Sequence, residues 1–402
     1  MAPGLIWLFL AGPVWSALGA IFLPRRYRIQ RGDPQLAGLA GGLWGAALGP
    51  FVLAPLYIAV PVLRRGLHVV FPSALVSSEL LLLFAHSNPG NVCVTDALYV
   101  LNQVQTGLTV GLLYATMAAG LTLIYSVQRI ISFTHGQFVM FGGVLTFLLL
   151  RDSDLNPIFV MPVVAIATFL LGVVIAQVLL KPVQAGTIER PDEYAILMTF
   201  GVGIFLTYAL VGTLGNPIAV RAARYTDRPL FGFDRAIFEF AGMRMRTDLL
   251  IAGAVGLVIF VALSWLLYRT WIGRSFRAVA MDRQAAAVVG IDAGAVFLWA
   301  FGIGTALAGL AGAALVPAFN FQVPEMAAQT AIRSYVIVVL GGLGSLRGAL
   351  LGALFLGVVE ALTAGCYPDP SKGATYQVAS GLLVFLVVLL VRPQGFFGRA
   401  DT

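Results

Sequence analysis

Apolar segments of membrane-spanning length recur along almost the whole chain, and they limit the fold more than any other feature. After the turn sequence Asn88-Pro-Gly-Asn91 they are 104–127, 134–150, 158–180, 194–214, 249–268, 293–316, 330–343, 348–364 and 376–391. Hydrophobic residues make up 59% of the 402 residues and charged residues only 11%, against about 25% charged in a typical soluble domain. One soluble core cannot bury this much apolar surface. We therefore expect an all-α, polytopic membrane helix bundle of about 10–11 spans, in which the short segment 330–343 is re-entrant or packed inside protein.

The first hundred residues contain additional apolar segments. Segments 4–23 and 36–62 flank a loop with four arginines, so we expect a helical hairpin over 4–62 whose tip is cytoplasmic. Segment 67–86 includes Glu79, and a crossing there would place the arginine loop outside, so we expect a peripheral or partly inserted piece. The turn then divides an N-terminal membrane extension, residues 1–100, from a main domain, residues 101–402.

Arginine sets the expected orientation, because basic loops stay in the cytoplasm. Loops 181–193 and 268–292 are then inside, and loops 215–248 and 317–329 are outside. Loop 215–248 breaks a clean rule, since it mixes six arginines with acidic residues; it suits docking of a soluble partner or is an ordinary solvated loop. The net charge of +7 fits cytoplasmic loops and acidic lipid head groups. Without a basic soluble domain, nucleic acid is not an expected partner.

The sequence has no group of residues at the spacing that a metal site or a nucleotide-binding loop requires. The histidines are far apart, the chain has only Cys93 and Cys366, and no Gly-Lys pair exists for a P-loop. We expect no cofactor, no metal site and no enzymatic activity, since no catalytic triad or carboxylate pair can be assembled. Both cysteines fall in expected outer loops, where oxidising conditions permit a disulfide, although two free thiols remain an alternative.

Polar residues inside or beside the spans are the candidate pathway residues. Glu360 interrupts an apolar run, so it must pair, stay protonated or face water. His135 begins an apolar segment, and a helix N-terminus there could face an anionic solute group. The candidates are Ser132, Thr134, His135, Gln137 and Glu360. The alternatives are a structural ion partner for Glu360 and a packing role for His135.

The stretch 268–292 is polar, basic and free of proline, between two apolar spans. Its composition predicts a helix or helix pair just outside the membrane. One interpretation is a handle gripped by another protein; the other is a basic loop that only fixes topology. Elsewhere, small residues recur every four positions at Gly107, Gly111, Ala115 and Ala119, which indicates closely packed helices.

Four blocks resemble the permeases of branched-chain amino-acid type ABC importers, in order and spacing. They are GLTVGLLYATMAAGLTLIY (107–125) with FTHGQF (133–138), GRSFRAVAMDRQAAAVVGI (273–291), VLGGLGSLRGA (339–349) with Glu360, and RPQGF (392–396). The resemblance implies an inner-membrane subunit with a second permease subunit that is homologous but usually non-identical, two cytoplasmic ATPases and a periplasmic substrate-binding protein. The solute would be a branched-chain amino acid or a related amino acid, amide or urea-like compound.

The resemblance also gives 268–292 the role of a coupling loop that transmits ATPase movement. The residues that match it are Arg274, Arg277, Asp282, Gln284, Ala285, Ala286 and Gly290. Other importers have Glu where this chain has Gln284, and the family usually has Asn-Phe-Ala where this chain has Ser132-Phe-Thr134. The competing functions are a secondary transporter or channel that uses Glu360 or His135 as a proton site, and a membrane scaffold without transport.

Overall fold

A computed structural model describes most of the chain after residue 92. The described residues are 93, 97–130, 132–184, 188–215, 218–220, 222–227, 236–240, 243–319, 321–367, 370–391 and 394–397. The expected hairpin 4–62 and peripheral segment 67–86 lie outside them. The chain divides into two compact units, residues 1–100 with 363–393 and residues 101–362 with 394–402.

All nine apolar segments after residue 100 are helical, which confirms the all-α membrane bundle. They are α5 (Ala97–Gln128), α6 (His135–Arg151), α7 (Pro157–Ile175), α9 (Pro191–Leu214), α10 (Thr247–Arg269), α13 (Ala293–Leu315), α14 (Glu325–Gly341), α15 (Leu346–Cys366) and α16 (Pro370–Val391). A π-helical turn, η1 (Ala176–Leu180), and α8 (Lys181–Gln184) continue α7. Among the described residues, six helices are long and apolar enough to cross a membrane, and two shorter ones are apolar.

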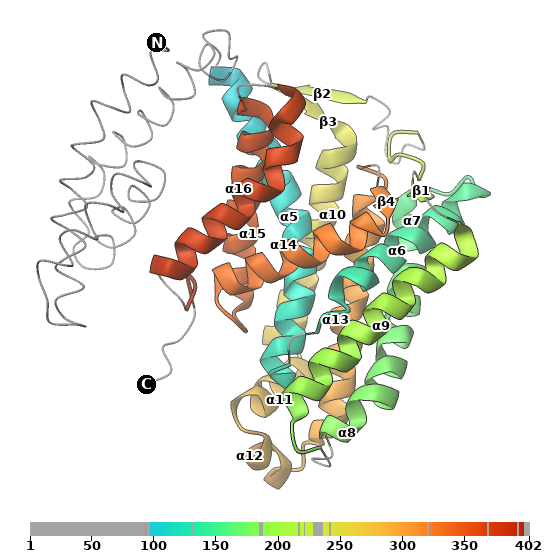
Figure 1. Cartoon of the computed structure of the whole chain (residues 1–402), viewed down its shortest axis with the longest axis vertical. Coiled ribbons are helices and arrows are strands. Elements are labelled where there is room, and N and C mark those ends of the chain that lie inside the picture. The colour runs from blue at the N-terminus through green and yellow to red at the C-terminus, as the bar shows by residue number, and fades with distance from the viewer. Residues whose placement is uncertain are drawn as a thin grey trace, which may run out of the picture. The chain divides into compact units, whose positions relative to one another are not determined.

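The loops of the larger unit gather at two opposite ends, as Figure 1 shows. At one end lie α8, α11 (Trp271–Met281) and α12 (Arg283–Val288). At the other end β1 (Ile218–Val220) pairs antiparallel with β4 (Phe321–Val323), and β2 (Ile237–Phe240) pairs with β3 (Met243–Arg246). The strand pair β1–β4 therefore joins the two loops expected outside, 215–248 and 317–329, at the end opposite the stretch 268–292.

Small residues allow the helices of the larger unit to touch at their backbones. A Cβ on Gly111 of α5 would lie 2.8 Å from the Cα of Leu354 on α15, and a Cβ on Gly142 of α6 would lie 2.5 Å from the Cα of Gly309 on α13. Such distances leave no room for a side chain. Tight packing is thus the structural role of the small residues at 107 and 111.

Helix α14 begins five residues before the expected segment 330–343 and runs unbroken for 17 residues. Thr330, Arg333 and Ser334 are buried on it. Of the two arrangements expected for this short segment, the structure favours packing against protein, because α14 is continuous and buried along one side.

Candidate substrate path and coupling segment

A buried ion pair joins α14 and α15. Nε of Arg333 donates to both carboxylate oxygens of Glu360, at 3.0 and 3.1 Å, and the hydroxyl of Tyr114 on α5 donates to Oε2 at 2.8 Å. Glu360 is 2% exposed and Arg333 8%. The guanidinium also lies over the Tyr114 ring, 5.5 Å from its centre. Glu360 is therefore a paired carboxylate held by two other helices.

Because the Arg333–Glu360 pair is buried, its two charges depend on each other for stability. Two charges withdrawn from water keep their ionised form at this depth only when hydrogen bonds and mutual attraction replace their hydration. The three hydrogen bonds to Glu360 supply that replacement, and Arg333 gains a further acceptor in Oε1 of Gln329, 3.2 Å from Nη1. Loss of one member would leave the other charge without compensation.

The candidate residues before and at the start of α6 form a second cluster. The hydroxyls of Ser132 and Thr134 are 2.9 Å apart, and the hydroxyl of Tyr335 on α14 donates to the carbonyl of Ser132 at 2.8 Å. In the orientation that satisfies its amide, Gln137 donates to the carbonyls of Phe133 (3.0 Å) and Thr134 (3.2 Å). This segment therefore contacts α14 through Tyr335.

His135 is fully buried between helices. Its Nε2 lies 2.9 Å from the carbonyl oxygen of Met117, and because a carbonyl can only accept, Nε2 carries the proton. Nδ1 is then a bare acceptor, and within the described part of the chain nothing donates to it. Gly136, the next residue, lies directly against the Ala327 carbonyl of α14. The first turn of α6 is thus covered by protein in this structure.

The stretch 268–292 forms the helix pair α11 and α12. The hydroxyl of Thr270 caps α11 by accepting from Gly273 N, and Oδ1 of Asp282 caps α12 by accepting from Gln284 N (2.8 Å) and Ala285 N (3.0 Å). Ala286 is the buried contact of α12. Gly290 ends the turn with φ +84, a conformation that favours glycine.

This helix pair presents apolar side chains to solvent. Met281 is 89% exposed, Val288 87% and Val289 73%. Arg274 lies 4.9 Å over the ring of Trp271, whereas Arg277 donates back to the carbonyl of Leu267 at the end of α10. Arg277 therefore holds α11 against α10, while Met281, Val288 and Val289 are exposed apolar side chains that a partner could cover.

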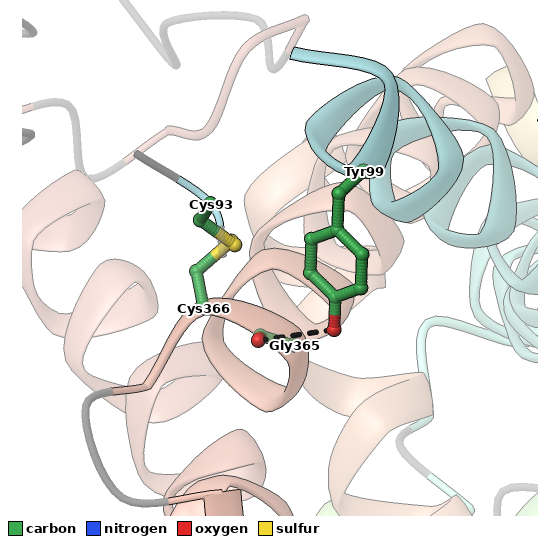
Figure 2. Close-up of a disulfide and its surroundings, with 4 residues drawn as sticks. All are labelled: Cys93, Tyr99, Gly365 and Cys366. Carbon is green, nitrogen blue, oxygen red and sulfur yellow. Dashed lines mark hydrogen bonds between the residues drawn. A yellow bond between two sulfur atoms is a disulfide. The ribbon is translucent and has the colours of Figure 1, made fainter. Parts of the chain in front are cut away.

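The structure contains a disulfide between Cys93 and Cys366, shown in Figure 2. Both residues belong to the smaller unit. Beside the bond, the hydroxyl of Tyr99 donates to the carbonyl of Gly365 at 3.3 Å. The two cysteines are 273 positions apart, so the bond joins the chain just before α5 to the last residue of α15.

Sequence reasoning missed the partners of Glu360. Arg333 lies within the expected segment 330–343, and it is the lone basic residue there, just as Glu360 is the lone acidic residue of 348–364. Two opposite charges in separate apolar segments were the available signal. Tyr114 carried none, because a tyrosine in an apolar run is common.

The fold defines a class: a multi-pass membrane protein. The family model of the permease component of the branched-chain amino acid transport system matches residues 103–391, and the chain belongs to this family.

Curated relatives agree. The chain is 28% identical to the high-affinity branched-chain amino acid transport system permease protein BraD of Pseudomonas aeruginosa, over 75% of this chain and 97% of that protein. It is 27% identical to LivH of Escherichia coli, over 76% and 97%. It is 28% identical to the autoinducer 2 import system permease protein LsrC of Salmonella paratyphi B, over 61% and 66%. No solved structure matches the chain.

Proposed function

We propose that this chain is a permease subunit of a binding-protein-dependent ABC importer in the bacterial inner membrane. Its solute is a small polar compound, a branched-chain amino acid or a related amino acid, amide or urea-like compound. ATP hydrolysis takes place in two cytoplasmic partner subunits, and a second homologous permease completes the membrane path. A periplasmic protein delivers the solute to the end that carries β1–β4.

The observation that carries this proposal is the exposed apolar surface of α11 and α12 in a member of a permease family. Exposure of Met281, Val288 and Val289 to water in a polar, basic segment is unfavourable, and contact with a partner would remove this exposure. An ATPase groove that accepts this surface would move α11 and α12 as it closes. Because Arg277 and Gly273 fix α11 against the end of α10, that movement would pass into the bundle.

The five candidate pathway residues belong to the wall of the solute path in this proposal. Glu360 acts through Arg333, and Ser132 acts through Tyr335. Thr134, His135 and Gln137 hold the start of α6 in place beside α14. A proton-coupled secondary transporter is the competing function, with the same Glu360 or His135 as its proton site.

Co-purification and uptake test the proposal together. The full chain is expressed together with candidate permease, ATPase and binding-protein subunits from the same genome, and we expect a stable complex with ATP-dependent uptake in proteoliposomes. Met281→Glu and Val288→Glu should release the ATPase from a folded permease. Ile237→Glu is the control, since Ile237 is an exposed apolar residue of β2 at the opposite end. Uptake that needs a proton gradient and no ATP overturns the proposal, as does an ATPase that stays bound to both glutamate variants.

A further inference from the structure

Helix α14 carries a continuous chain of polar side chains along one side. Nε2 of Gln329 donates to Oε1 of Glu325 at 2.7 Å, and Nη1 of Arg333 donates to Oε1 of Gln329 at 3.2 Å. The ion pair to Glu360 extends this chain inward. Glu325, Gln329 and Arg333 are four residues apart, so they follow one face of the helix from its β4 end toward its middle.

This face is partly open. Glu325 and Ala328 are exposed, Gln329 is half-buried, and Ile332 is 40% exposed. The outward side of α10 is apolar instead, with Leu257, Val258 and Val261 exposed. Placing charged and amide side chains against lipid hydrocarbon is energetically unfavourable, whereas the apolar side of α10 is compatible with a lipid contact. The open side of α14 therefore faces water or another protein chain.

One nitrogen of the Arg333 guanidinium, Nη2, makes no hydrogen bond among the described residues. Glu360 engages Nε and Gln329 engages Nη1. The edge formed by Nη1 and Nη2 matches the two oxygens of a carboxylate, which arginine binds in a bidentate manner. If a carboxylate took this edge, Oε1 of Gln329 would lose its donor and could accept from an ammonium group one turn away.

We propose that the open side of α14 lines the solute path and binds a zwitterionic α-amino acid there. Arg333 holds its carboxylate, and Gln329, beside Glu325, accepts from its ammonium group. Glu360 and Tyr114 are positioning residues that keep Arg333 oriented and charge-balanced before the solute arrives. This inference rests on the proposed function and narrows its solute class, since urea and simple amides carry neither charge.

Thiol labelling in the assembled importer tests the location of the path. Ala328→Cys and Ile332→Cys are treated with a charged, membrane-impermeant methanethiosulfonate, while both native cysteines are protected in their disulfide. Val258→Cys is the matched control, because Val258 is 67% exposed but lies on the apolar side of α10. We expect the α14 thiols to react about tenfold or more faster, since the reactive thiolate forms in water. Equal rates at Ile332 and Val258 overturn the path.

Transport tests the solute class. The importer is given a panel of radiolabelled α-amino acids and, separately, radiolabelled urea. The double variant Arg333→Gln with Glu360→Gln removes both charges together, so it leaves no unpaired buried ion. We expect this variant to assemble and hydrolyse ATP, with amino-acid uptake lowered roughly tenfold to a hundredfold. Gln329→Leu should lower uptake about tenfold, and Gln105→Leu, a half-buried glutamine of α5, should not.

The outcomes separate the two proposals. Uptake of urea without amino acids overturns the zwitterion assignment, and so does normal amino-acid uptake by the double variant, which makes the pair purely structural. If the thiols on α14 react in the assembled complex but no ATP-dependent uptake is found, the result supports α14 as the lining of a path and overturns the proposal that the complex is an importer.

Discussion

Gly107 of α5 lies against Val358 of α15 so closely that a Cβ on Gly107 would be 2.6 Å from the Cα of Val358. The obstacle is backbone, which cannot rotate away as a side chain can. Gly357 meets α5 in the same way from the other helix, since a Cβ on Gly357 would be 2.8 Å from the Cα of Gly111. The two helices are thus locked at a crossing that admits only glycine.

Gly107→Ala should therefore destabilise the protein, by about 1–3 kcal/mol, because overpacking forces the helices apart. Thermal unfolding of the detergent-solubilised protein measures this. Gly201→Ala on α9 is the control: nothing lies within 4 Å of its added methyl group, so it should stabilise the helix by about 0.5–1 kcal/mol. Equal unfolding temperatures for the two variants would contradict the crossing.

The Arg333–Glu360 pair predicts unequal losses of stability for two substitutions, one of Glu360 itself and one of Tyr114. Glu360→Leu leaves a buried guanidinium without its carboxylate and should cost about 3–5 kcal/mol. Tyr114→Phe removes one hydrogen bond to a charged acceptor and should cost about 1.5–3 kcal/mol. Chemical unfolding of the two variants ranks them. A Tyr114→Phe protein less stable than Glu360→Leu would show that Arg333 does not depend on Glu360.

The disulfide predicts the thiol chemistry of the smaller unit. Denatured protein should take up no maleimide before reduction and two maleimides after it, which mass spectrometry counts. Cys93→Ser with Cys366→Ser should lower stability by about 2–5 kcal/mol, because the bond closes a long loop. Two maleimides on the unreduced protein would exclude the bond.

The sequence predicted the helices well, because apolar length alone fixes them in a membrane. It placed the start of α14 at residue 330, since Glu325 and Gln329 lower the apolar signal although they continue the helix. It found Glu360 but missed Arg333, because sequence gives depth along a helix and not the direction a side chain faces. The Arg333–Glu360 pair forms only if α14 and α15 are rotated so that both side chains face each other. Backbone contacts such as Gly341 against Gly348 set this rotation.

The cap of α12 predicts how the proposed coupling segment, residues 268–292, responds to small changes. Oδ1 of Asp282 accepts from two of the free backbone N–H groups in the first turn of α12, those of Gln284 and Ala285, and a helix of six residues has few other interactions that start it. Asp282→Ala should cost about 1 kcal/mol locally, loosen the segment and reduce uptake severalfold in the assembled importer. Asp282→Asn is the matched control, because its amide oxygen accepts the same two bonds.

We therefore expect normal uptake for Asp282→Asn and lowered uptake for Asp282→Ala, with hydrogen exchange of α12 faster only in the alanine variant. Equal losses in both would mean that the charge of Asp282, and not its cap, contacts the ATPase. In that case Asp282 would lie in the contact surface itself, together with Met281 and Val288.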